Sequence, residues 1–260
     1  MMIDKIAAAS DYTSQQITSN FTDYTYTVNI YVPNGDVPEG GFPVLYVLDG
    51  SSYFHLVKEA VRLQSRNAPK TGILPAIVVG IGHGADMHER RFYDFTGQAE
   101  TYTYPARFKG KGHEKHGGAE NFSRFLEEEL KPSIQAQLSV NVQQQALFGH
   151  SLAGYFVLWQ LFHHQASFQR YIAISPSIWW NEHELLKYAS TFIKERPYAY
   201  EKLFIGVGEL ETFMVDDAKQ IAGDLEKIMD IAFYEALEEN HASIVPTVMS
   251  RAIRFVNKNE

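Results

Sequence analysis

A serine flanked by small residues is the first candidate for chemistry in this chain. Residues 149–154 read Gly-His-Ser-Leu-Ala-Gly, directly after an apolar strand-like run and directly before an apolar helix-like stretch. A nucleophile on a sharp strand-to-helix turn needs small neighbours, because the turn forces backbone segments together. The start of the helix also favours developing negative charge. We therefore expect Ser151 to be a nucleophile, although Ala153 stands where the usual pentapeptide has glycine. The alternative is a serine that caps the helix.

His241 is the candidate general base. A serine hydroxyl is a poor nucleophile at neutral pH and needs a base beside it. For a serine on this kind of turn, the chain order is serine, acid, histidine, with the histidine in the loop after the last strand. His241 follows the strand-like run 232–237 and precedes a closing helix-like run at 244–256. Of the ten histidines, it fits this position best.

Two carboxylates could orient that histidine. Glu209 and Glu211 both follow the strand-like run 203–207, where the acid of such a triad is expected. The acid would hold the imidazole tautomer and stabilise the imidazolium. We favour Glu211, because it lies three residues beyond the glycine at the strand end. Glu209, or a serine–histidine dyad without a firm acid, remains open.

An oxyanion hole requires two backbone N–H groups. One is expected from Leu152, the residue after the nucleophile. The other is expected from the loop after the strand-like run 44–48, which reads Asp-Gly-Ser-Ser. Gly50 lets this loop approach closely, and Ser51 is the candidate donor. The alternative is an ordinary turn between a strand and a helix.

The elements that must position these residues alternate between strand-like and helix-like runs, which predicts an α/β fold with a mostly parallel central sheet and helices on both faces. One domain over residues 1–260 is expected. An antiparallel arm is predicted at 24–32, and helices are predicted at 120–138, 152–165, 215–231 and 244–256. A kink or break is expected at Pro132. Residues 98–118 read as a long loop near the cleft. The strand-like runs are 44–48, 76–80, 146–148, 171–174, 203–207 and 232–237.

Composition limits the function classes. The 45% hydrophobic and 21% charged content is ordinary for a soluble enzyme. A net charge of −8 argues against a nucleic-acid partner, since phosphate binding needs a basic face. With no cysteine, disulfides and thiolate chemistry are excluded. No apolar run approaches the roughly 18 residues of a membrane span, and the start does not read as a signal peptide, so a cytoplasmic location is expected.

Several segments together resemble the esterase family of α/β hydrolases that includes the enterobactin and bacillibactin esterases. The chain is also similar to feruloyl and acetyl-xylan esterases and to S-formylglutathione hydrolase. The resemblance runs from about residue 24 to residue 256 and looks closest to the siderophore-esterase branch. The segments are VLYVLDG at 44–50, ERRFYDFTG at 89–97, GGAENFSRFLEEELKP at 117–132, FGHSLAGYF at 148–156, ISPSIWWN at 174–181, VGELE at 207–211 and NHASIVP at 240–246.

The resemblance implies roles for individual residues. Ser151 and His241 correspond to nucleophile and base, and Ser51 and Leu152 to the oxyanion donors. The acid corresponds less cleanly, since members of this branch differ in how their histidine is supported. Aromatic residues beside the cleft correspond to Trp179 and Trp180, for which core packing is the alternative.

The resemblance also implies a substrate class. The expected activity is carboxylic-ester hydrolysis through an acyl-enzyme, on siderophore trilactones or, alternatively, on short-acyl or aryl esters. A ferric tris-catecholate needs cationic and aromatic groups at the site. Arg90 and Arg91 could equally be structural and bridge Asp94. The candidate cations are Arg90, Arg91, Arg107, Lys109, Lys111 and Lys115.

A noncatalytic binding protein and a peptidase are the alternatives to an esterase. A noncatalytic binding protein of this fold typically lacks the nucleophile or the histidine, and both stand here. A peptidase would turn over amides as well as esters. No cofactor is implied, and His113 and His116, three apart in a Gly/Lys-rich loop, are expected to be solvated and not to bind a metal. The oligomeric state is left open.

Overall fold

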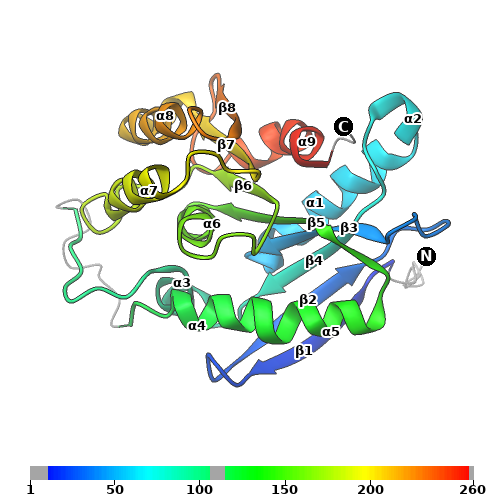
Figure 1. Cartoon of the computed structure of the whole chain (residues 1–260). Coiled ribbons are helices and arrows are strands. Elements are labelled where there is room, and N and C mark those ends of the chain that lie inside the picture. The colour runs from blue at the N-terminus through cyan, green and yellow to red at the C-terminus, as the bar shows by residue number, and fades with distance from the viewer. Residues whose placement is uncertain (1–10, 106–114, 258–260) are drawn as a thin grey trace, which may run out of the picture.

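The computed structural model describes residues 11–105 and 115–257, and their strands form one eight-stranded sheet in the order β1-β2-β4-β3-β5-β6-β7-β8 (Figure 1). The first two strands run antiparallel to their neighbours, and β3 to β8 are parallel. The mostly parallel sheet expected from the sequence is confirmed. The strands are β1 (Thr13–Ser19), β2 (Tyr24–Tyr31), β3 (Phe42–Leu48), β4 (Ile77–Gly82), β5 (Val140–His150), β6 (Arg170–Ile174), β7 (Lys202–Gly208) and β8 (Asp230–Ala236).

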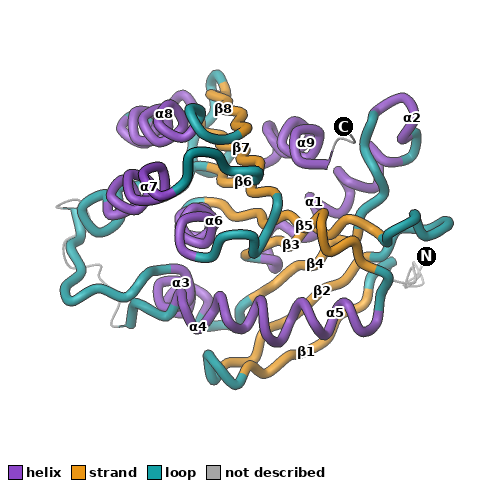
Figure 2. Tube along the Cα trace, viewed as in Figure 1, coloured by secondary structure: helices purple, strands orange, loops and turns teal. Residues whose placement is uncertain are grey.

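Helices cover both faces of this sheet, as expected (Figure 2). One apolar cluster joins the sheet to α1 (Gly50–Ser65) and α9 (Ile244–Asn257). The other cluster joins the opposite face to the remaining long helices. These and the short helices are α2 (Ala68–Thr71), α3 (Met87–Phe95), α4 (Ala119–Arg124), α5 (Lys131–Gln137), α6 (Leu152–His163), α7 (Glu184–Glu195) and α8 (Phe213–Leu225).

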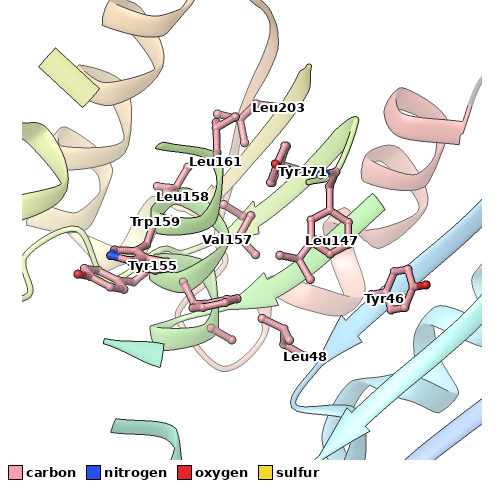
Figure 3. Close-up of a cluster of buried hydrophobic side chains, with 14 of the residues drawn as sticks. Tyr46, Leu48, Leu147, Tyr155, Val157, Leu158, Trp159, Leu161, Tyr171 and Leu203 are labelled. Atoms are coloured by element: carbon pink, nitrogen blue, oxygen red, sulfur yellow. Dashed lines mark hydrogen bonds between the residues drawn. The ribbon is translucent and has the colours of Figure 1, made fainter. Parts of the chain in front are cut away.

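Helix α6 is the central helix of the second face. Eleven of its twelve residues are buried, so it is apolar on all sides and not along one stripe. Figure 3 shows its side chains beside those of the central strands, with Leu147 and Leu203 among them. Because α6 begins directly after Ser151, this packing fixes the direction in which the helix start points.

The helix predicted over 120–138 is interrupted by a short segment of a different helix type. Between α4 and α5 the residues Phe125–Leu130 form a π-helical segment, immediately before Pro132 in the first turn of α5. Proline lacks an N–H and clashes with the preceding turn of a regular helix. The wider π turn is one of the ways a helix accommodates this. The expected irregularity therefore takes the form of a π segment.

The parallel strands deliver their following loops to one edge of the sheet. Strands β3, β5, β6, β7 and β8 all end there, so the loops after them lie side by side. Ligands of open α/β sheets bind at this carboxyl edge. Within the described ranges, no helix combines the length and apolar character that a bilayer crossing requires.

Candidate active site

Ser151 occupies the turn between β5 and α6 in a strained conformation, with φ 60° and ψ −119°. A β-carbon on Gly149 would lie 2.3 Å from the carbonyl oxygen of Ala153, and one on Gly154 would lie 3.0 Å from that of Ile174. Gly149 is therefore required by close backbone contacts and Gly154 is tightly enclosed by them, whereas the methyl of Ala153 is accommodated in the core. Such backbone strain costs about 1–3 kcal/mol and is maintained only by the surrounding structure.

Neighbouring backbone holds this turn in place. The N–H of Ser151 donates to the carbonyl of Ile174 at 3.0 Å, and the N–H of Ser177 donates to the carbonyl of Ser151 at 3.1 Å. The turn is thus pinned on both sides by the end of β6 and the loop that follows it. The serine side chain is left free to face the cleft.

Ser151, His241 and Glu211 form an unbroken hydrogen-bonded chain. The Oγ of Ser151 lies 2.9 Å from Nε2 of His241, and Nδ1 of His241 lies 2.5 Å from Oε1 of Glu211. With Nδ1–H donating to the carboxylate, Nε2 is the ring nitrogen that can accept the serine proton. The structure brings together the three residues that were predicted as nucleophile, acid and base. They come from the loops after β5, β7 and β8.

Glu211 is held by more than the histidine. Its Oε2 accepts hydrogen bonds of 2.6 Å from the hydroxyl of Ser175 and of 2.6 Å from the N–H of Gly208. Burial alone would raise the pKa of the Glu211 carboxyl, but the hydrogen bonds from His241, Ser175 and Gly208 outweigh it, and the pKa is lowered. Glu211 is therefore ionised at neutral pH. Sequence reasoning missed Ser175, although its position directly after β6 marks it as facing the same edge.

Glu209, the other candidate acid, has a different partner. Its Oε2 accepts a hydrogen bond of 2.9 Å from the N–H of Glu238, and its side chain is exposed. It thus fastens the loop after β8 and does not contact the imidazole of His241.

The two expected oxyanion donors both stand at helix starts. Leu152 is the first residue of α6 and Ser51 is the second residue of α1. Backbone N–H groups in the first turn of a helix have no intrahelical acceptor, so both are available to a ligand. Their role in binding an oxyanion stays a prediction.

A cleft of about 320 Å³ opens in front of Ser151 and His241. One side carries Arg91, whose Nε donates to Asp49 at 2.8 Å, and the other sides are largely apolar. Sequence reasoning missed Phe213 and Met214, which begin α8 just after the acid-bearing turn. The lining residues are Arg91, Phe92, Ser151, Leu152, Ser177, Trp179, Phe213, Met214 and His241.

A family model described as "Putative esterase" matches residues 19–243. The chain belongs to this esterase family. It is 38% identical to the ferri-bacillibactin esterase BesA of Bacillus subtilis, over 93% of this chain and 88% of that protein. The fold and the activity expected from the sequence, a serine carboxylic-ester hydrolase, are thereby confirmed.

Two solved structures are close in fold to this esterase. The BES protein from Bacillus cereus superposes with a TM-score of 0.89 at 40% identity, covering 96% of this chain and 97% of the other. The siderophore hydrolase EstA from Aspergillus nidulans superposes with a TM-score of 0.86 at 26% identity, covering 99% and 97%.

The predicted substrate-binding residues of the esterase fall in different places. Trp179 lines the cleft, but Trp180 is fully buried, which is the core-packing alternative. Arg90 is not among the cleft residues: it pairs with the buried Asp94 at 2.8 Å, the structural alternative left open for it. Arg107 lies outside the described residues. Among the described residues, Arg91 is a cation that lines the cleft.

The described part of the loop over 98–118 packs by aromatic contacts. The ring of His116 stacks on that of Tyr102 with centroids 4.6 Å apart, and its Nε2 lies 2.6 Å from the hydroxyl of Tyr104. The expectation of a solvated His116 is therefore wrong; His113 lies outside the described residues. Among residues 11–105 and 115–257, no group of three or more His, Asp or Glu side chains is placed to hold a metal ion.

Proposed function

We propose that this esterase hydrolyses the ester bonds of siderophore trilactones through an acyl-enzyme on Ser151. The observation that carries the mechanism is the chain of hydrogen bonds from the cleft-lining Ser151 through His241 to the buried Glu211. A nucleophile, a base at hydrogen-bond distance and a group that orients the base are what acyl transfer needs.

The acylation step follows from this geometry. Nε2 of His241 removes the proton of Ser151 as Oγ attacks the ester carbonyl, and the oxyanion accepts hydrogen bonds from the N–H groups of Leu152 and Ser51. When the tetrahedral intermediate collapses, the imidazolium gives its proton to the departing alkoxide, which leaves as the alcohol. A water then attacks the acyl-enzyme with His241 again as base, and Ser151 is released with its proton restored.

Glu211 stabilises the imidazolium that forms during both steps. Its lowered pKa keeps the carboxylate ionised, so a negative charge faces Nδ1 of His241 throughout the cycle. Because Glu211 is 7% exposed, water screens this interaction little. Ser175 and Gly208 hold the carboxylate in place and compensate for its burial.

Two observations support a siderophore as substrate. The relative BesA, named for ferri-bacillibactin, is similar along almost the whole chain. The cleft also offers a cation beside aromatic rings, since Arg91, Phe92 and Trp179 line it. A catecholate is an aromatic ring that carries negative charge, so it matches both kinds of group. The cleft volume lies at the low end for ligand pockets, about 300–1,000 Å³, which suits one arm with the rest of the trilactone at the mouth.

The test compares ferric enterobactin with p-nitrophenyl acetate and butyrate. We expect the wild type to cleave the ferric trilactone with a far higher kcat/KM, and Ser151→Ala to abolish cleavage of all three. Ser190→Ala, an exposed serine on α7, is the matched control and keeps full activity. A fluorophosphonate should add its mass once to the wild type and to Ser190→Ala, and not to Ser151→Ala. Full activity of Ser151→Ala would refute the mechanism.

A generalist aryl or short-acyl esterase is the second candidate. The apolar lining contributed by Trp179, Phe213 and Met214 favours it, because such a surface binds an uncharged acyl or aryl group without a need for Arg91. The two candidates differ in Arg91→Gln: a siderophore hydrolase loses activity on the anionic substrate selectively, and a generalist esterase loses nothing. Comparable kcat/KM values for butyrate ester and ferric trilactone would favour the generalist.

A further inference from the structure

Behind the imidazole of His241 lies a second histidine that the mechanism does not use. His150 is the last residue of β5, directly before the nucleophile, and it is 7% exposed. Its ring centroid lies 4.6 Å from that of His241, with the ring planes inclined by 40°. The side chain of His241 is 44% exposed, so one side of it rests on His150 while another is open.

A tyrosine from a third segment fixes the ring of His150. The hydroxyl of Tyr53 lies 2.8 Å from Nδ1 of His150, and the two rings meet edge to face with centroids 5.6 Å apart. Tyr53 belongs to α1, the helix whose first turn contains Ser51. Contacts therefore run from α1 through the end of β5 to the loop after β8.

The charge of His150 suits a place beneath a catalytic base. Burial lowers the pKa of His150 to about 3, with the neighbouring His241 acting in the same direction. His150 is therefore neutral throughout the pH range in which His241 works as a base. A neutral ring does not repel the imidazolium that forms on His241 during acylation, as a second cation would.

We propose that His150 is a positioning residue: its ring, fixed by Tyr53, supports one side of His241 so that both nitrogens stay aligned between Ser151 and Glu211. This inference rests on the proposed serine mechanism. The ring also keeps water from that side of His241. Since Tyr53 and Ser51 share the first turn of α1, the same contact keeps the general base in register with the predicted oxyanion donor.

Other groups that face this pair bear on any pH effect. Glu211 contacts His241 from the turn after β7, and Arg91 from α3 lines the same cleft. Glu211 raises and Arg91 lowers the pKa of His150, each less than burial does. Asp49, at the start of α1, is bound to Arg91 and faces Tyr53. The test variants leave Glu211, Arg91 and Asp49 in place.

The experiment measures kcat, KM and the pH dependence of kcat/KM with p-nitrophenyl butyrate. We expect His150→Ala to lower kcat about 10- to 100-fold, since small displacements of a catalytic group have effects of this size. KM should change less than about twofold, because His150 is not among the cleft residues. The acid limb of the profile should move to higher pH, because water replacing the ring lets His241 be protonated more readily.

Two further variants separate support from folding. His150→Phe keeps a ring and should restore the acid limb to its wild-type position and most of kcat. Tyr53→Phe should lower kcat less than His150→Ala does, in the same direction. His163→Ala is the matched control, since His163 also stacks on an aromatic ring, Trp159, and lies on α6 away from the cleft.

An unchanged acid limb in His150→Ala, or an equal shift in His163→Ala, would overturn the positioning role. If His150→Ala does not fold, His150→Phe and Tyr53→Phe decide: wild-type kcat in Tyr53→Phe together with lost activity in His150→Phe would contradict it. Ser151→Ala, measured alongside, separates the two proposals. If Ser151→Ala retains activity, the serine mechanism itself has failed, whatever His150 does.

Discussion

Two of the histidine–carboxylate pairs in the described part of the chain have a buried carboxylate, and only one of these two faces a nucleophile. His241 and Glu211 meet at the carboxyl edge of the sheet, with an Nδ1 to Oε1 distance of 2.5 Å. His83, just after β4, lies 3.0 Å through Nε2 from Oδ2 of Asp94 on α3. In the second pair both side chains are almost completely buried, whereas His241 is partly open to the cleft.

The partners of each pair explain the difference. Asp94 also binds the hydroxyl of Tyr26 and the guanidinium of Arg90, so its charge is neutralised within the fold. Glu211 has no cationic neighbour of this kind among its hydrogen-bond partners in the described chain, which are two neutral donors and His241. Its charge therefore acts mainly on the imidazole. A histidine–carboxylate pair thus stabilises α3 against the sheet at His83 and Asp94, and can support a catalytic base at His241 and Glu211.

The largest expected effect separates the two histidines. His241→Ala should lower kcat by roughly 10⁴- to 10⁶-fold, as loss of the base does in serine hydrolases, with little change in the free energy of unfolding. His83→Ala should do the reverse, keeping kcat within about threefold while unfolding becomes easier by roughly 2 kcal/mol. Steady-state kinetics and urea denaturation measure both. Comparable kcat losses in the two variants would remove the distinction.

The next largest effect should separate the two candidate acids, Glu211 and Glu209. Glu211→Gln should lower kcat by roughly 10³-fold, because the amide can stabilise the wrong tautomer of His241 and carries no charge for the imidazolium. Glu209→Gln is the matched control and should keep wild-type kcat, since Glu209 accepts a hydrogen bond from the backbone N–H of Glu238 and not from His241. Equal losses in both variants would mean that Glu211 does not orient the base.

Glu211→Gln also has a signature in the pH dependence of stability. The folded-state pKa of Glu211 is lowered from 4.5, so its ionised form stabilises the fold. This contribution is fully present above the unfolded pKa and is lost as the pH falls through the lower, folded pKa. The difference in unfolding free energy between wild type and Glu211→Gln should therefore be constant near neutral pH and change only below about pH 4.5.

Asp94→Asn tests the buried pair from its acid side. Removing this charge leaves Arg90 without its ionic partner in the interior, which should lower the free energy of unfolding by roughly 3 kcal/mol. The triad is untouched, so kcat well below the melting temperature should stay within about threefold of wild type. A kcat loss as large as that of Glu211→Gln, without loss of stability, would mean that Glu211 had wrongly been assigned as the catalytic carboxylate.

The sequence predicts this esterase's fold well because it depends on local signals, and the same signals favour Ser151, His241 and Glu211 as one group while leaving Glu209 open as the acid. The small residues around Ser151, the position of His241 after the last strand and the alternation of strand and helix are all visible in the chain. The edge strand β1 was not predicted, since its polar residues carry no burial pattern. The sequence also does not show that Arg91 lines the cleft while Arg90 pairs with Asp94. Adjacent residues of one helix point to different sides, and only the packing of α3 decides which one faces the cleft.

Ser175 is the clearest case of a residue that sequence reasoning missed, and it gives the smallest predicted effect. It follows β6 with φ 42°, is fully buried, and donates to Oε2 of Glu211. Ser175→Ala should lower kcat about tenfold and the free energy of unfolding by about 1 kcal/mol, because one of three hydrogen bonds to the carboxylate is lost. Since His241 and Gly208 still hold Glu211, the loss must be far smaller than that of Glu211→Gln. In the double variant Ser175→Ala/Glu211→Gln, kcat should equal that of Glu211→Gln alone, because Ser175 acts only through this carboxylate. Additive losses would mean that Ser175 contributes to catalysis by another route.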